Sequence, residues 1–314
     1  MKKIFILFIL IIICVLVLTN SNDILNSVIF SFNIWKNNIF PSLFPFFIIS
    51  QLLINYGFVE VLSELFKPLM NFFNLNKNCA FIFIMSMLSG FPTNAKYTKE
   101  LYNNNLINEY EASKILAFTS FSNPLFIIGT VSIVFLNNTF MAPLILFSHY
   151  FPNFIIALML KNYYPSKRDN SSIDIVKTLK NIEVKNDNFG LVLTNAIKNA
   201  IETLLSILGI ITIYLIFTTL LSNSFSLNDF LLSLLSGFIE MTQGLKYVSI
   251  LNISLKFKTI LSCMILSCGG LSVHMQVLSI ISDTKINFLP FFTCRIIHSL
   301  FSGIISYILF DFII

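Results

Sequence analysis

The stretch "FTSFSNPLFIIG", residues 118–129, lies inside a long apolar segment but has polar side chains in its middle. Its polar residues and its proline are Thr119, Ser120, Ser122, Asn123 and Pro124. Proline is favoured at the first position of a helix, and asparagine is favoured as the N-cap before it. The stretch therefore predicts that one helix ends here and that a second begins at Pro124.

The two helical pieces together are long enough to cross a bilayer. Asn108 and Glu111 have the spacing of a capping box, which predicts a first helix over 109–120. This piece would be about 18 Å long and the second, over 124–136, about 20 Å, whereas the hydrocarbon core is about 30 Å thick. The break then lies within the membrane, where unpaired backbone groups facing lipid are costly. We interpret it as part of a binding site; a proline kink packed against neighbouring helices is the alternative.

The composition is that of an integral membrane protein. Of the 314 residues, 56% are hydrophobic and 11% are charged, whereas soluble domains usually have about 25% charged residues. The net charge of +5 comes from lysines in the polar connections, which is typical of cytoplasmic loops and does not indicate nucleic-acid binding. Because the apolar blocks have helical lengths, we predict an all-α polytopic membrane protein.

The N-terminal stretch, residues 1–20, combines a basic start with an apolar core. It lacks a small-x-small cleavage site after Leu18, which favours an uncleaved signal anchor, with the N-terminus inside, over a cleaved signal peptide. The five cysteines lie in or beside apolar segments and form no CxxC pair. We interpret them as small membrane hydrophobes, not as disulfide partners or metal ligands.

Eight further apolar segments follow along the chain. They span about 39–57, 79–91, 114–136, 140–160, 198–221, 227–239, 259–282 and 288–310. Segments 79–91 and 227–239 have about half of the roughly 20 residues that a spanning helix needs, which predicts half-helices or re-entrant hairpins. Segments 114–136 and 259–282 are long enough but interrupted.

The two halves of the chain resemble each other. "SMLSGF" at 86–91 returns as "SLLSGF" at 233–238, and the segments that begin with His149 and His298 also match. These matches predict an internal duplication. If the polar stretch 161–188 is cytoplasmic, the first repeat starts outside and the second inside, so the repeats are inverted, as in many transporters.

The second interrupted segment contains "LSCGGLSVHMQVLS", residues 266–279. Gly269 and Gly270 permit the backbone to unwind and to approach a ligand closely. Polar side chains follow at Ser272, His274 and Gln276. We interpret His274 as facing a cavity, because ionisable groups within membranes usually do so; a satisfied packing residue is the alternative.

The two short segments end in polar turns. Pro92, Asn94 and Lys96 follow the first, and Glu240 and Thr242 follow the second, so each turn is predicted to be a half-helix tip. Glu240 is a candidate for proton or cation coupling or for pairing with Lys96. A solvated, idle carboxylate at the interface is the alternative.

The sequence contains no motif of a catalytic or cofactor site. No Cys or carboxylate lies at zinc-ligand spacing from His149 or His298, which favours a structural role for both. A P-loop, GxGxxG, GxSxG and HExxH are all missing from the chain. We therefore expect no catalytic residue, no metal and no cofactor, and we do not expect an enzyme.

Several of these stretches together resemble one known family. They are "FPSLFPFFIISQLLINYGF", "LSGFPTNAK", "SNPLFIIG", "GFIEMTQGL" and "GGLSVHMQVLS". The chain from about Phe40 to its C-terminus is similar to the YlbJ-like sporulation integral membrane proteins, which belong with the nucleoside-recognition, or gate, domain proteins. One departure is "SGFPTNAK" where "SGYPxGAK" is expected, which puts the role of Asn94 in doubt.

The resemblance implies a multi-pass protein of spore-forming bacteria that moves dipicolinate from the mother cell toward the forespore. It also implies kinship in fold with the core of concentrative nucleoside transporters, whose substrate site lies between hairpin tips and interrupted helices. Four regions are expected: a signal-anchor helix and loop (1–38), a gate-like repeat (39–160), a cytoplasmic linker (161–190) and a second gate-like repeat (191–314).

We therefore predict a permease for a small aromatic anion, most of all dipicolinate, in the outer forespore membrane. The alternatives are a transporter of nucleosides or related metabolites and a non-transporting scaffold for spore assembly. The lipid bilayer and the anion are the expected partners, and a homo-oligomer is compatible with this reading. The predicted substrate-binding residues are Pro92, Asn94, Lys96, Ser122, Asn123, Pro124, Glu240, Thr242, Gly269, Gly270, Ser272, His274 and Gln276.

Overall fold

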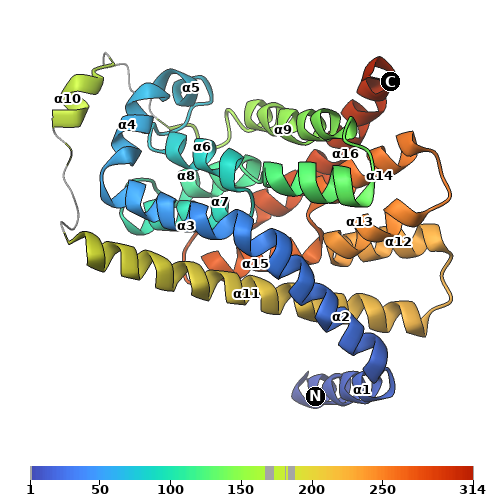
Figure 1. Ribbon diagram of the computed structural model, residues 1–314. Coiled ribbons are helices and arrows are strands. Elements are labelled where there is room, and N and C mark those ends of the chain that lie inside the picture. The colour runs from blue at the N-terminus through green and yellow to red at the C-terminus, as the bar shows by residue number, and fades with distance from the viewer. Residues whose placement is uncertain (1, 167–172, 181, 183–187, 314) are drawn as a thin grey trace.

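The protein is a bundle of helices in which several helices are short or broken (Figure 1). The computed structural model describes residues 2–166, 173–180, 182 and 188–313. Its first half contains α1 (Lys2–Thr19), α2 (Ser21–Ile34), η1 (Trp35–Ile39), α3 (Phe40–Asn55), α4 (Phe58–Leu65), α5 (Lys67–Phe72), α6 (Cys79–Ser89), α7 (Thr93–Asn103), α8 (Glu109–Phe118), η2 (Phe126–Phe135) and α9 (Met141–Met159). Its second half contains α10 (Ile175–Lys180), α11 (Phe189–Ser224), α12 (Asp229–Ile239), α13 (Met241–Ile250), α14 (Leu255–Cys268), α15 (Gly270–Ile281) and α16 (Leu289–Ile313).

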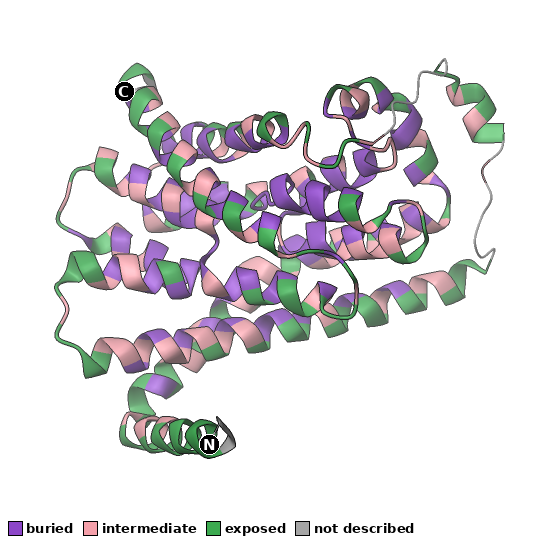
Figure 2. Ribbon diagram, turned by 180° about the vertical axis from the view of Figure 1, so that it is seen from behind, coloured by how far each residue is buried: buried purple, intermediate pink, exposed green. Residues whose placement is uncertain are grey.

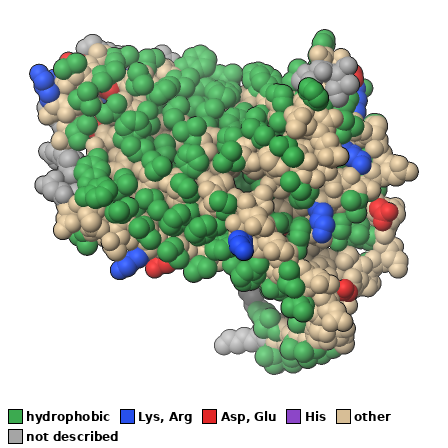
Figure 3. Space-filling model, in the orientation of Figure 1, with side chains coloured by type: hydrophobic (Ala, Val, Ile, Leu, Met, Phe, Trp, Pro, Cys, Tyr) green, Lys and Arg blue, Asp and Glu red, His purple; other side chains and the backbone are tan. Residues whose placement is uncertain are grey.

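The length and composition of the helices are those of a polytopic membrane protein, as predicted. Five helical stretches among the described residues are long and apolar enough to cross a membrane: Ser21–Asn55, Met141–Met159, Phe189–Ser224, Leu255–Ile281 and Leu289–Phe312. Charged side chains are sparse on the face that Figure 3 shows, and hydrophobic side chains cover much of it. Such a surface is suited to lipid, because large apolar areas are not left in contact with water.

Each half of the chain contains a similar series of elements. A long helix, α3 or α11, precedes a pair of short helices, α6–α7 or α12–α13; in the first half only, α4 and α5 come between them. A broken helix comes next, either α8 with η2 or α14 with α15, and a continuous helix, α9 or α16, ends each half. The predicted half-helices and both predicted interruptions are therefore confirmed at the level of single elements.

The N-terminal region differs from the expected helix and loop. Residues 21–34 form α2, which continues through η1 into α3, so the expected loop is wrong. The polar side chains of α2 have partners on α11: Ser27 and Thr219 hydroxyls are 2.6 Å apart, and Ser31 and Thr212 hydroxyls 2.8 Å. The polar residues of this stretch are typical of a loop, but here their side chains form hydrogen bonds with α11.

The last helix of the chain packs against helices of both halves. α16 packs against α14 of its own half and against α8 and α9 of the first half. Buried residues accordingly concentrate in the middle of the molecule, whereas α1 and the outer face of α11 are largely exposed (Figure 2). The two halves thus share one core, which brings their broken helices together.

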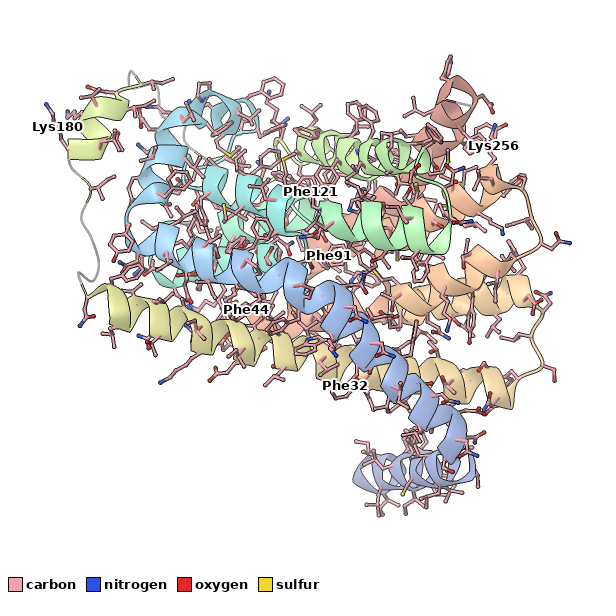
Figure 4. The ribbon with its side chains drawn as sticks, in the orientation of Figure 1. Phe32, Phe44, Phe91, Phe121, Lys180 and Lys256 are labelled. Atoms are coloured by element: carbon pink, nitrogen blue, oxygen red, sulfur yellow. The ribbon has the colours of Figure 1, made fainter. Side chains whose placement is uncertain are left out.

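Polar contacts join the connections at each end of the bundle. Lys99 and Asp283 form an ion pair of 2.7 Å, and the Asn287 amide donates to the Ser113 hydroxyl nearby. At the opposite end, Lys256 pairs with Asp311 at 2.6 Å. Lys180 and Lys256 mark the two ends in Figure 4. The linker outside the described ranges, residues 167–172, 181 and 183–187, is part of the predicted cytoplasmic region.

Candidate functional site

The tip of the first hairpin lies directly on the first helix break. The Phe91 amide donates to the Phe121 carbonyl at 2.7 Å, and both side chains lie near the middle of the molecule (Figure 4). The Asn123 side-chain amide donates to the Ser89 carbonyl at 3.1 Å. Gly90 has φ of 81°, and a Cβ there would lie 2.4 Å from the Asn123 nitrogen. Only glycine fits this close approach.

The first break has the predicted cap. α8 ends at Phe118, slightly before the expected end near Ser120, and the capping box of Asn108 with Glu111 is confirmed. The Asn123 side-chain oxygen accepts from the Leu125 and Phe126 amides at 2.8 and 3.4 Å. The second piece continues as the π-helix η2, where an α-helix was expected.

The tip of the second hairpin lies on the second break in a similar way. Gly269, with φ of 81°, separates α14 from α15. A Cβ on Gly270, whose φ is 66°, would lie 3.0 Å from the Gly237 carbonyl oxygen and 3.1 Å from the Met241 nitrogen. The Ser272 hydroxyl lies 3.4 Å from a Glu240 carboxylate oxygen. Both halves therefore place a glycine where a hairpin tip meets a break.

Glu240 is a buried carboxylate at the turn between α12 and α13. It is 1% exposed and caps α13, since it accepts from the Gln243 amide at 2.9 Å and from the Thr242 hydroxyl. No Lys or Arg of the described residues forms a salt bridge with it. Among the described residues, its carboxylate oxygens contact the Gln243 amide and the hydroxyls of Thr242 and Ser272.

A pocket lies where the two tips and the two breaks come together. Six of the predicted site residues line it: Pro92, Ser122, Asn123, Glu240, Thr242 and Gln276. The remaining lining is mostly apolar and comes from Ile39, Ser42, Leu43, Phe91, Phe126, Ile207, Ile211, Met241 and Val273. The cavity volume is about 50 Å³, enough for a few water molecules. A ring compound would fit only if the walls moved apart, because ligand pockets usually have about 300–1,000 Å³.

Other predicted residues belong to the same breaks or hairpins without lining this pocket. Gly269, Gly270 and Ser272 lie in or beside the second break, and Pro124 follows the Asn123 cap. Asn94 is fully buried in the first turn of α7, and neither atom of its side-chain amide has a hydrogen-bond partner among the described residues. An unpaired buried amide is rare in folded proteins.

Two predicted residues face away from the pocket. The Lys96 ammonium donates to the Thr203 hydroxyl at 3.2 Å and lies 4.3 Å from the centre of the Phe47 ring. His274 lies among the rings of Phe288, Phe291 and Phe292, and its Nε2 is 3.1 Å from the Cys268 carbonyl oxygen. The proposed pairing of Lys96 with Glu240 does not occur in this structure.

A second, more open cavity adjoins the pocket. Its walls include Glu202, Thr203 and Ser206 on α11 and Gln276 and Ser279 on α15, and its volume is about 240 Å³. Ile207 and Gln276 line both cavities. These two residues therefore lie between the two cavities.

Sequence reasoning missed several residues of this region. Phe91 and the α3 residues Ser42 and Leu43 line the pocket but carry no chemical signal by which sequence alone could select them. Arg295, by contrast, is 1% exposed near the breaks. A single arginine in the apolar segment 288–310 was a usable signal, because cations are costly within a membrane.

The chain is similar to proteins of one described family. A family model described as nucleoside recognition (Gate) matches residues 38–139, which include the first hairpin and the first break. The sporulation integral membrane protein YlbJ of Bacillus subtilis (strain 168) is 33% identical over 306 residues, which cover 87% of this chain and 74% of the relative. This chain belongs to the YlbJ family.

Membership of the YlbJ family agrees with the resemblance noted in the sequence. It makes the chain a sporulation integral membrane protein with a nucleoside-recognition gate domain. No solved structure is significantly similar to it. No cluster of three or more His, Cys, Asp or Glu side chains that could hold a metal ion occurs in the part of the chain that the structure describes.

Proposed function

We propose that this YlbJ-family protein is a permease that carries a small ring compound through the pocket between the hairpin tips and the helix breaks. The observation that supports this most is the composition of the pocket wall. Both hairpins and both broken helices contribute to it. Helix breaks at membrane depth are tolerated only against protein or a polar cavity. A scaffold that carries nothing has no need of two of them facing one space.

The open cavity between α11 and α15 is the proposed access route. Because Ile207 and Gln276 line both spaces, a change in these two side chains would join them. Thr203, Ser206 and Ser279 make the outer cavity polar enough for a hydrated solute. A ligand would then lose its water stepwise as it approaches Glu240.

Dipicolinate is the first candidate substrate, moved from the mother cell toward the forespore across the outer forespore membrane. The family is one of sporulation proteins, and the helix N-termini at Asn123 and Gly270 can attract carboxylates. However, Glu240 lines the pocket, whereas no Lys or Arg does. A dianion would therefore bind only when Glu240 is protonated or paired with a cation. We propose that transport of dipicolinate requires that neutralisation.

A nucleoside or a related neutral metabolite is the second candidate. An ionised Glu240 accepts hydrogen bonds from hydroxyl groups, and Asn123 and Gln276 add amide donors and acceptors to the pocket. The match to the nucleoside-recognition model covers the first half of this site. The carboxylate of Glu240 in the pocket wall favours a nucleoside, whereas membership of a sporulation family favours dipicolinate.

Uptake into proteoliposomes distinguishes the two candidates. Labelled dipicolinate and labelled uridine are offered to the parent protein and to Glu240→Gln between pH 6 and 8. For dipicolinate, we expect parent uptake to rise as the pH falls, and Glu240→Gln to stay fast at every pH. For uridine, we expect Glu240→Gln to be slower by about tenfold or more at every pH, because a charged acceptor is lost.

The matched control is Glu60→Gln, which neutralises an exposed carboxylate on α4, outside the pocket. It should leave both profiles unchanged. If neither compound moves through the parent protein, the permease hypothesis is wrong for both substrates and the scaffold alternative gains support.

A further inference from the structure

Three buried side chains connect the two helix breaks from behind the pocket. They are His149 on α9 and Arg295 and His298 on α16, and each is at most 1% exposed. None of them lines the pocket. Their hydrogen bonds connect elements from both halves of the chain, including the residues at the two breaks.

His149 bonds both breaks through one imidazole ring. Its Nε2 accepts from the Ser122 backbone amide at 2.8 Å, and its Nδ1 is 2.8 Å from the Ser267 hydroxyl oxygen. A backbone N–H can only donate, so Nε2 has no proton. The ring proton is therefore on Nδ1, which donates to Ser267. Ser122 belongs to the first break, and Ser267 is two residues before Gly269.

His298 has the opposite tautomer. An Arg295 guanidinium nitrogen lies 2.6 Å from its Nδ1, and arginine can only donate. The proton of His298 is therefore on Nε2, which is 2.6 Å from the His149 carbonyl oxygen and donates to it. The two histidines begin the matching sequence segments of the two halves, and their ring centres are 4.8 Å apart.

Arg295 attaches this chain of bonds to the end of α8. It donates to the Ala117 carbonyl at 2.9 Å, to the Ser120 carbonyl at 3.1 Å and to the Asn153 side chain at 3.1 Å. The carbonyls at a helix C-terminus are unpaired and lie at the negative end of the helix dipole. The buried cation is thus compensated by the interrupted helix, and it would lose this partner if α8 continued without a break.

We propose that Arg295, His298 and His149 form a clamp that sets the position of the two breaks relative to each other. Within it, His149 in its Nδ1–H form is the positioning residue of the binding pocket. It acts through Ser122, which lines the pocket, and through Ser267, which precedes the glycines of the second break. The effect of the clamp on ligand binding rests on the proposed function, whereas the clamp itself does not.

The tautomers provide a test that needs no substrate. The chain has three histidines, so protein labelled with ¹⁵N-histidine gives three sets of ring signals. His149→Gln and His298→Gln assign them. At pH 7 we expect His149 to be neutral with its proton on Nδ1, and His298 to be neutral with its proton on Nε2. A doubly protonated ring, or Nε2–H at His149, would overturn the clamp.

Milder variants test the connection between the breaks. Ser267→Ala removes the acceptor of the His149 ring proton and should shift the His149 Nδ1 signal while leaving His298 unchanged. Ser148→Ala is the matched control, because Ser148 is buried on the same helix and its hydroxyl has no partner among the described residues. If both variants leave the His149 signals unchanged, the bond to Ser267 does not exist and the proposal fails.

Uptake measurements then relate the clamp to the pocket. With whichever of dipicolinate or uridine the parent protein transports, His149→Leu should lower the apparent affinity by about tenfold, since two hydrogen bonds are lost. His149→Gln, whose amide can both accept and donate, should restore most of it. Equal affinity in His149→Leu and the parent would show that the clamp does not position the pocket. If the parent transports neither compound, the tautomers still decide the clamp.

Discussion

Asn123 shows at the scale of a single residue how a break can be both stable and polar. Its side-chain oxygen caps η2, while its side-chain nitrogen donates to the Ser89 carbonyl in the first hairpin. One amide therefore satisfies the start of a helix and attaches a hairpin tip to it. Asparagine is suited to this because it has both a donor and an acceptor.

Asn123→Ala should affect function more than stability. We expect a loss of about 1 kcal/mol in the free energy of unfolding, as for other N-caps, together with a clear loss of uptake of the transported compound. Asn228→Ala is the matched control, since Asn228 caps α12 from an exposed position outside the pocket. It should show a similar loss of stability with normal uptake. Equal uptake in both variants would remove Asn123 from the site.

Three buried charged side chains, Lys114, Arg295 and Glu240, contact the ends of helices. The Lys114 ammonium donates to the carbonyls of Phe73, Asn74 and Lys161, and the Arg295 guanidinium donates to carbonyls at the end of α8. Glu240, conversely, accepts from the first turn of a helix. Each of these three charges meets the helix end of opposite sign, and for Arg295 that end exists only because α8 is interrupted.

The hairpins and the breaks form a pair in each half at the scale of elements. A glycine lies at each contact, Gly90 in the first half and Gly270 in the second, and both have positive φ. The two glycines have the same role but do not correspond in the sequence. Gly90 belongs to a hairpin, whereas Gly270 belongs to a broken helix. The contact between the two elements, and not a particular residue pattern, is what the two halves share.

Alanine at either glycine should separate the hairpin from the break. The added Cβ of Gly90→Ala would lie 2.4 Å from the Asn123 nitrogen, and that of Gly270→Ala 3.0 Å from the Gly237 oxygen. Both residues also have the left-handed backbone that non-glycine residues avoid. We expect lower melting temperatures, with Gly90→Ala the more severe.

Gly129→Ala is the control for this pair, because a Cβ there would meet no atom within 4 Å. It should melt like the parent or slightly above it. A Gly90→Ala variant as stable as Gly129→Ala would show that the hairpin tip can move away from the break at little cost.

At the scale of the whole molecule, polar contacts between the connecting segments lie at the two ends of the bundle. Asn223 bonds Asp23 at one end, where Lys256 also pairs with Asp311. Lys99 pairs with Asp283 at the other. These pairs join segments that an inverted arrangement of the repeats would place on the same side of the membrane. They support the proposal of inverted topology, which a labelling experiment can decide.

Cysteines introduced one at a time, in a background where the exposed Cys14 and the half-buried Cys268 are replaced by serine, should label from two sides. We expect Lys180→Cys and Ser282→Cys to react with an impermeant thiol reagent from the cytoplasmic side, and Asn137→Cys and Asn252→Cys from the outer side. All four positions are exposed. Labelling of Lys180→Cys and Asn137→Cys from one side would exclude the inverted topology.

Local features of the fold could be predicted from the sequence because their causes are local. The capping box before α8, the Asn123 cap, the two half-helices and the glycine break at Gly269 depend on residues a few positions apart. The stretch 20–38 is helical, against the prediction, because its partners are distant in the sequence. Its polar side chains indicate a loop when considered alone, and they form a helix because α11 supplies their partners.

Only the tertiary structure determines which of the polar residues line the pocket. Gln276 lines the pocket, whereas His274, two residues earlier on α15, lies among aromatic rings. Residues two apart on a helix point in nearly opposite directions, since each residue turns the helix by about 100°. Composition marks both as polar groups at membrane depth, but only the packing of α15 against the hairpins and α16 determines which of them meets a ligand.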